Sequence, residues 1–138
     1  YENPKKRIGV PNHDNVWGYL IYMLSLVEQG KVDFIDESFK LNDEISLYPI
    51  PGHTPGQVAI VVKSKGERAI IVGDLLSSAL QLTQVDVSIG WDSDPALSTQ
   101  SRKKVFAELA DTNTILFATH VPGGGHLVVK DGGGYRLK

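Results

Sequence analysis

The 138-residue sequence contains no cysteine, and this absence excludes two kinds of structure. Without thiols the chain can form neither a disulfide nor a zinc site with thiolate ligands. The chain also has no apolar run of the roughly 18 residues that a membrane-spanning helix needs. We therefore expect no membrane partner, and any metal site must be built from histidine and carboxylate side chains.

Positive charge is also scarce, because 14 lysine and arginine residues stand against 16 aspartate and glutamate residues, for a net charge of −2. A protein that neutralises the phosphates of nucleic acid usually presents a basic face. The basic run near the N-terminus, Lys-Lys-Arg at 5–7, is short and typical of a solvated terminus. The composition therefore predicts no nucleic-acid partner.

Three apolar runs each end in a side chain that can bind a metal ion. His53 lies in Pro-Gly-His-Thr-Pro-Gly at 51–56, Asp74 in a Gly-Asp pair and His120 in a Thr-His pair. Proline and glycine leave the backbone around His53 few conformations, so its imidazole loses little entropy when it binds a ligand. Strands of one sheet can bring their ends to a common edge, so the sequence predicts that the three side chains converge.

A β-hairpin is predicted where two apolar runs, 57–63 and 68–72, are separated by Ser-Lys-Gly-Glu. In an antiparallel pair the start of the first strand and the end of the second lie at the same edge of the sheet. His53 precedes the first strand and Asp74 follows the second. The hairpin alone therefore predicts that these two residues share an edge.

Periodicity and turn residues predict the other elements: strands over 32–35, 45–50, 115–120, 127–130 and 135–137, helices over 16–29 and 95–110, and a mixed segment over 75–84. On the second helix Leu97, Val105 and Leu109 are expected to face inward, while the basic triplet 102–104 stays in water. No internal repeat or linker is visible, so we expect a single domain over 1–138.

Taken in order, the three motifs resemble the C-terminal half of a metallo-β-lactamase-fold hydrolase. Trp-Asp-Ser-Asp-Pro at 91–95 and Thr-His-Val-Pro-Gly-Gly-Gly-His at 119–126 look most like the branch that contains methyl parathion hydrolase and the acyl-homoserine lactonases. The resemblance covers nearly the whole chain from about Lys31 onward. It implies an α/β (α+β) fold, with one β-sheet and its helices forming half of a four-layer αββα sandwich.

The resemblance also assigns metal ligands. His53 matches the third histidine ligand of a first metal, Asp74 the carboxylate that bridges two metals, and His120 the last histidine ligand, on the second metal. The His-x-His-x-Asp-His motif that supplies the remaining ligands is not present, since the other histidines are His13 and His126. We therefore interpret the chain as half of such a hydrolase, with the N-terminal part removed.

The chemistry that the resemblance implies is metal-assisted hydrolysis, with Asp74 and His120 in the catalytic set. Two divalent cations, usually zinc, would share a hydroxide that attacks an ester, lactone or phosphotriester of a small-molecule substrate. The lack of a Gly-x-Ser-x-Gly elbow agrees with chemistry that needs no serine nucleophile. For this chain by itself, His53, Asp74 and His120 could hold one zinc ion with an open position.

A cytoplasmic location is expected.

Four further residues are candidates for the pocket, each with a structural alternative. His126 is a proton or hydrogen-bond donor near the pocket, or a residue at a strand start. Asp92 is a partner of a metal-bound histidine, or a turn cap. Trp17 and Tyr22 form the wall of an apolar pocket, or their helix, which is apolar almost all round, packs between the sheet and the missing half or against a second copy.

A competing hypothesis makes the chain a non-catalytic fragment or a dimerising interaction module. Half of a sandwich leaves one sheet face and the apolar helix uncovered, and such surfaces rarely stay bare. The expected partner is then a second copy in a homodimer, or the missing N-terminal half.

Overall fold

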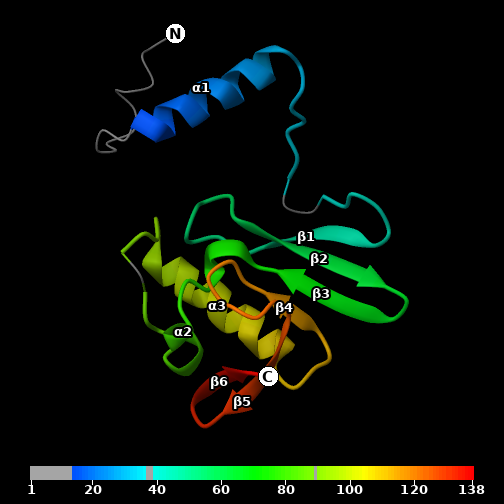
Figure 1. Cartoon of the computed structure of the whole chain (residues 1–138), viewed down its shortest axis with the longest axis vertical. Helices are drawn as coiled ribbons and strands as arrows, with labels where there is room; N and C mark the ends of the chain where they lie inside the picture. The colour runs from blue at the N-terminus through cyan, green and yellow to red at the C-terminus, as the bar shows by residue number, and fades with distance from the viewer. Residues whose placement is uncertain (1–13, 37–38, 89) are drawn as a thin grey trace. The chain divides into compact units, whose positions relative to one another are not determined.

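The computed structural model describes residues 14–36, 39–88 and 90–138, and the side chains among them from residue 21 onward. The chain divides into two compact units after Ile35 (Figure 1). The first unit contains helix α1, and the second contains a six-stranded sheet with the remaining helices. The single domain expected from the sequence stays a prediction. No helix in the described part of the chain has both the length and the apolar character to cross a membrane.

Helix α1 spans Asp14–Glu28, which confirms the first predicted helix. It ends in a Schellman motif, in which the Lys31 N–H donates to the Leu26 carbonyl and the Gly30 N–H to the Val27 carbonyl, both at 3.0 Å. Gly30 has a φ of +66°, which glycine adopts without the steric cost of a Cβ atom. The glycine that follows the apolar run thus fixes the end of the helix.

Four apolar side chains of α1 are exposed, namely those of Ile21, Tyr22, Leu24 and Val27. Because these side chains are exposed among the described residues, the expected burial of the helix stays a prediction. The place of Tyr22 in a pocket wall also stays a prediction. Trp17 belongs to α1, but its side chain lies outside the described residues, as does the whole of His13.

The strand expected over 32–35 is wrong. Residues 31–36 form neither strand nor helix, and the side chain of Phe34 is 85% exposed. An apolar, β-branched stretch becomes a strand only where a neighbouring strand offers a ladder and a surface to pack on. This stretch lies before the first strand of the sheet, so among the described residues it has no neighbouring strand and no surface to pack on.

The second unit is built on one mixed sheet whose strands follow chain order from β1 to β6. The strands are β1 Ile45–Pro49, β2 Val58–Ser64, β3 Glu67–Ile71, β4 Ile115–Phe117, β5 His126–Asp131 and β6 Gly134–Leu137. Neighbours are antiparallel except β3 and β4, which are parallel. The end of β3, the end of β4 and the start of β2 therefore lie at one edge (Figure 1).

The predicted hairpin between β2 and β3 is confirmed. Its loop consists of Lys65 and Gly66, with φ values of +52° and +85°. Two positive φ angles define a type I′ turn, whose twist matches the twist of the flanking strands. Ser64 consequently pairs with Glu67, and this pairing sets the register of the ladder that leads to the edge.

One face of the sheet packs on helix α3, Pro95–Leu109, and the two share the buried core. The core cluster comprises Ile50, Ala59, Val61, Ile70, Val72, Leu75, Leu76, Leu82, Val105, Phe106, Leu109, Leu116 and Val128. On the opposite face a row of paired residues, Ile60, Ile71 and Phe117, remains exposed. This single sheet with helices is the α/β architecture that the sequence predicts.

The basic triplet on α3 does not behave as expected. Lys103 and Lys104 are exposed, but Arg102 is only 1% exposed, so its predicted solvation is wrong. Position 102 lies three and seven residues before Val105 and Leu109, so it falls on the inward stripe of the helix. The helical period therefore overrides the charge.

Buried Arg102 is satisfied by backbone carbonyls. Its Nη1 donates to the Leu75 carbonyl at 3.1 Å, its Nε to Val85 at 3.1 Å and its Nη2 to Val87 at 2.9 Å. Burial lowers the pKa of Arg102, and the nearby negative charge of Asp92 opposes this effect. The guanidinium thus ties α3 to the segment that carries the short helices η2, Gly73–Leu75, and α2, Leu80–Thr83.

Candidate functional site

The loop that carries His53 is fastened to the segment just before α3. The Asp94 N–H donates to the Gly52 carbonyl at 2.8 Å, and the Ser93 N–H donates to the His53 carbonyl at 3.1 Å. Asp94 also caps α3, because its carboxylate accepts from the Leu97 N–H at 2.9 Å. The start of the helix and the His53 loop are therefore held in one unit.

Gly52 is the position where this close approach demands glycine. Its φ is +136°, and a Cβ atom there would lie 2.1 Å from the Ser98 nitrogen. A second contact holds the loop against α3: the Ser101 hydroxyl donates to the Pro51 carbonyl at 2.7 Å. The proline and glycine residues around His53 thus serve a tight contact with α3 as well as a turn.

Asp74 and His120 meet because the pairing of β3 and β4 continues beyond the strands. The Val72 N–H donates to the Phe117 carbonyl at 2.9 Å, and the Thr119 N–H lies 3.4 Å from the Gly73 carbonyl. Gly73 has a φ of +54°, which turns the chain into η2 and places Asp74 at the edge of the sheet.

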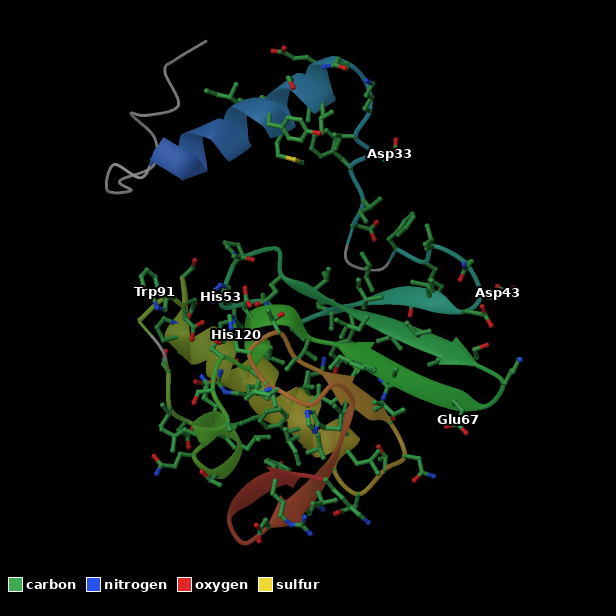
Figure 2. All side chains as sticks on the ribbon, viewed as in Figure 1. Asp33, Asp43, His53, Glu67, Trp91 and His120 are labelled. Atoms are coloured by element: carbon green, nitrogen blue, oxygen red, sulfur yellow. The ribbon has the colours of Figure 1, made fainter. Side chains whose placement is uncertain are left out.

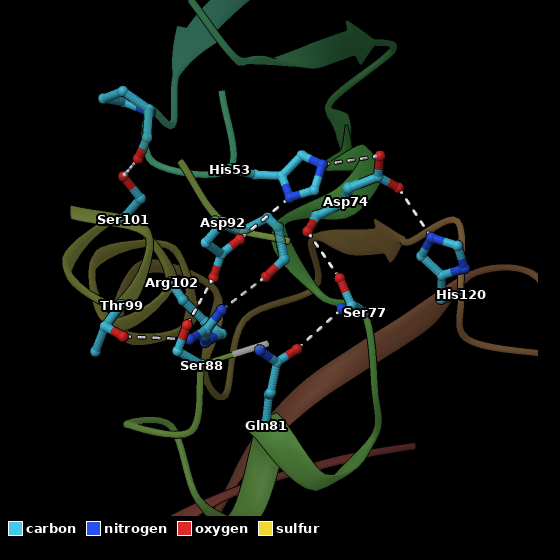
Figure 3. Close-up of polar contacts among 12 residues, drawn as sticks. His53, Asp74, Ser77, Gln81, Ser88, Asp92, Thr99, Ser101, Arg102 and His120 are labelled. Atoms are coloured by element: carbon cyan, nitrogen blue, oxygen red, sulfur yellow. Dashed lines mark hydrogen bonds and ion pairs between the residues drawn. The ribbon is translucent and has the colours of Figure 1, made fainter. Parts of the chain in front are cut away.

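The structure brings together the three residues that the sequence predicts to converge (Figure 3). His120 Nε2 lies 3.0 Å from Asp74 Oδ1, and His53 Nε2 lies 3.6 Å from Asp74 Oδ2. Asp74 therefore offers a different oxygen to each imidazole. All three side chains are partly exposed, so a ligand can reach them.

Asp92 is the buried neighbour of this group. Its side chain is 1% exposed, its Oδ1 lies 3.1 Å from His53 Nδ1, and its Oδ2 accepts from the Ser88 hydroxyl at 3.1 Å. When Nδ1–H donates to this carboxylate, the lone pair of the ring is on Nε2. Asp92 therefore contacts a site histidine, and its role as the partner of a metal-bound histidine stays a prediction.

His126 has a different partner from these residues. Its Nε2 is 3.0 Å from the Pro122 carbonyl, so the ring bonds to its own turn. A cavity of about 330 Å³ is lined by His53, Asp74, Ser77, Trp91 and His120. Sequence patterns do not single out Trp91 as a lining residue, although it stands next to Asp92.

Within the part of the chain that the structure describes, no group of three or more histidine, aspartate or glutamate side chains is placed to hold one metal ion. The three-ligand zinc site expected from the sequence is therefore not found, although imidazole and carboxylate are ligand types that zinc accepts.

Residues 2–120 match the family model of the metallo-beta-lactamase superfamily, and the chain belongs to this superfamily. Three solved structures show what the fold is similar to. AidC, described as a dizinc quorum-quenching lactonase in complex with a product, N-hexanoyl-L-homoserine, is 30% identical with a TM-score of 0.73, over 80% of this chain and 38% of that chain.

The hydrolase AbOPH, of the beta-lactamase superfamily, is 24% identical with a TM-score of 0.75, over 83% of this chain and 40% of its own. A probable metal-dependent hydrolase from Staphylococcus aureus is 18% identical with a TM-score of 0.65, over 80% of this chain and 41% of its own. At 24% and 18% identity, the similarity to these two structures shows only that the chain shares their fold. No curated protein sequence matches the chain. The chain thus spans 38% to 41% of the length of these three structures.

Proposed function

We propose that this chain is part of a metal-dependent hydrolase in which His53, Asp74 and His120 bind a pair of divalent cations, with zinc as the expected metal. One observation carries the proposal: Asp74 turns one oxygen toward each of two imidazole nitrogens. A carboxylate that divides its oxygens in this way can bridge two cations, each of which also takes one histidine. Superfamily membership and the dizinc lactonase among the similar structures support it.

The observed separations suit shared ligation. Two ligands of one tetrahedral zinc ion, each about 2.0–2.2 Å from the metal, lie roughly 3.4 Å apart. The nitrogen-to-oxygen distances of 3.0 Å at His120 and 3.6 Å at His53 fall on either side of that value. Small side-chain shifts would therefore replace each contact by a shared cation.

The residues of this chain then have separate tasks. His53, Asp74 and His120 would hold the cations, and Asp92 would hold the imidazole of His53 with Nε2 free for a ligand. When bound, the cations polarise a carbonyl or phosphoryl oxygen and lower the pKa of water toward neutrality. The cavity of about 330 Å³ admits a small molecule. We propose an ester, lactone or phosphotriester substrate, with a lactone first because of the AidC likeness.

The test is hydrolysis by the zinc-loaded chain of one acyl-homoserine lactone, one nitrophenyl ester and one phosphotriester. We expect turnover that requires the metal and that is lost in Asp74→Asn. His126→Ala is the control and should keep its activity, because the His126 ring contacts the Pro122 carbonyl of its own turn and does not line the cavity. Turnover that survives Asp74→Asn, or none from a chain shown to carry zinc, would overturn the proposal.

The homodimer expected under the competing hypothesis stays a second candidate. The observation that favours it is the exposed row of Ile60, Ile71 and Phe117 across three neighbouring strands. An apolar face that repeats on a second copy can pair with itself about a two-fold axis. Light scattering after size exclusion tests it, since a dimer that Ile71→Lys converts to a monomer supports this candidate. A monomeric parent chain excludes it.

A further inference from the structure

Trp91 is an exposed aromatic side chain at the candidate site. Its side chain is 82% exposed, yet it lines the same cavity as His53, Asp74 and His120. Figure 2 shows Trp91 in the same region of the second unit as the two histidines. Leaving an indole in water forgoes the stabilisation that burial of so large a side chain would give. The fold therefore gains little from tryptophan at this position.

The backbone fixes where this indole stands. The next residue, Asp92, is buried against the His53 ring, and the N–H of Ser93 donates to the His53 carbonyl. The short segment that positions His53 thus also carries Trp91.

The lining has two chemical characters. Four of its five residues, His53, Asp74, Ser77 and His120, present imidazole, carboxylate or hydroxyl groups, and Trp91 presents an apolar ring. A ligand that matches both has a polar reacting group and an apolar substituent. A flat indole face accepts an acyl chain or an aromatic ring with little loss of entropy, because the side chain has few rotatable bonds.

We propose that Trp91 determines specificity by packing against the apolar acyl substituent of an ester or lactone. This inference rests on the proposed function and names the substrate class for it. The carbonyl of such a substrate lies at the histidines and Asp74, and the chain of the acyl group lies along the indole. Substrates with a short acyl group gain nothing from this contact.

The kinetic test compares Trp91→Ala and Trp91→Phe on a series of esters with acyl groups of increasing length. For long acyl groups we expect Trp91→Ala to lower kcat/KM about 10-fold or more, mainly through KM, and for an acetyl group to leave it unchanged. Trp91→Phe should restore most of the loss. An equal loss for short and long acyl groups would mean a structural role and would overturn the inference.

A second test needs no turnover. The chain has two tryptophans, so Trp17→Phe leaves Trp91 as its single indole emitter. Titration with hexanoate and decanoate should shift the emission of Trp91 saturably, with decanoate binding more tightly. A length-dependent shift without any hydrolysis would refute the proposed function and leave only the contact between Trp91 and the acyl chain. Hydrolysis without a length-dependent shift would support the proposed function and refute the role of Trp91.

Discussion

Asp92 Oδ1 lies 3.1 Å from His53 Nδ1, and the carboxylate that makes this contact is almost fully buried. A buried carboxylate is costly unless it is paired, and this one is paired with His53 and with Ser88. The contact orients the imidazole and fixes which nitrogen is free to bind a cation.

Asp92→Asn should therefore weaken zinc binding. An amide gives a weaker, neutral partner to Nδ1–H, and removal of such a partner typically costs about 10–100-fold in metal affinity. The same change two residues on, Asp94→Asn, is the matched control, because asparagine caps a helix as well as aspartate does. Competition titration with a zinc-sensitive dye measures both variants. Equal affinity in the two variants would contradict the role given to Asp92.

Gly52→Ala should destabilise the fold strongly. The new Cβ would lie 2.1 Å from the Ser98 backbone nitrogen, so the His53 loop and the start of α3 must separate. We expect a loss of about 3 kcal/mol or more in the free energy of unfolding, measured by urea titration. Gly56→Ala is the control, because its Cβ would meet nothing within 4 Å. If both variants unfold at the parent's urea concentration, the close contact is absent in solution.

Arg102→Met should lose about 2–4 kcal/mol of stability, because it leaves the carbonyls of Leu75, Val85 and Val87 buried without their donor. The neighbouring change Lys103→Met removes an ion pair with Asp86 in which both side chains are exposed. Such a pair contributes at most about 1 kcal/mol. Thermal and urea unfolding should separate the two variants clearly. Similar losses of unfolding free energy would show that the hydrogen bonds of Arg102 do not stabilise the fold.

Ile70 and Ile71 are neighbours in β3 that face opposite sides of the sheet. Ile70 is 1% exposed in the core on α3, and Ile71 is 42% exposed on the outer face. Ile70→Ala should cost about 2–4 kcal/mol and Ile71→Ala clearly less. Chemical denaturation of the two variants checks this order. The reverse order would mean that the outer face, and not the face on α3, carries the core.

The convergence of His53, Asp74 and His120 could be predicted because it follows from local rules. Each residue lies three to five residues from the end of a strand whose direction is set by a short turn or a crossover helix. Those rules depend on glycine, proline and apolar spacing, which the sequence displays.

Other features depend on contacts that no local pattern encodes. Arg102 carries a charge, yet the helical period buries it once the segment from Leu75 to Val87 supplies carbonyls. The stretch 32–35 has the residues of a strand and lacks a neighbour. The exposure of Trp91, and the division of the two Asp74 oxygens between two histidines, are set by side-chain positions within the assembled site.

The most direct test of the central proposal is the zinc content of the purified chain after equilibrium dialysis, determined by elemental analysis. Variants His53→Ala, Asp74→Asn and His120→Ala test the three ligands, and His126→Ala is the control. We predict that the parent chain and His126→Ala retain zinc and that the other three lose it. A parent chain without zinc, or zinc that stays bound in Asp74→Asn, would contradict the proposal that Asp74 bridges a pair of cations.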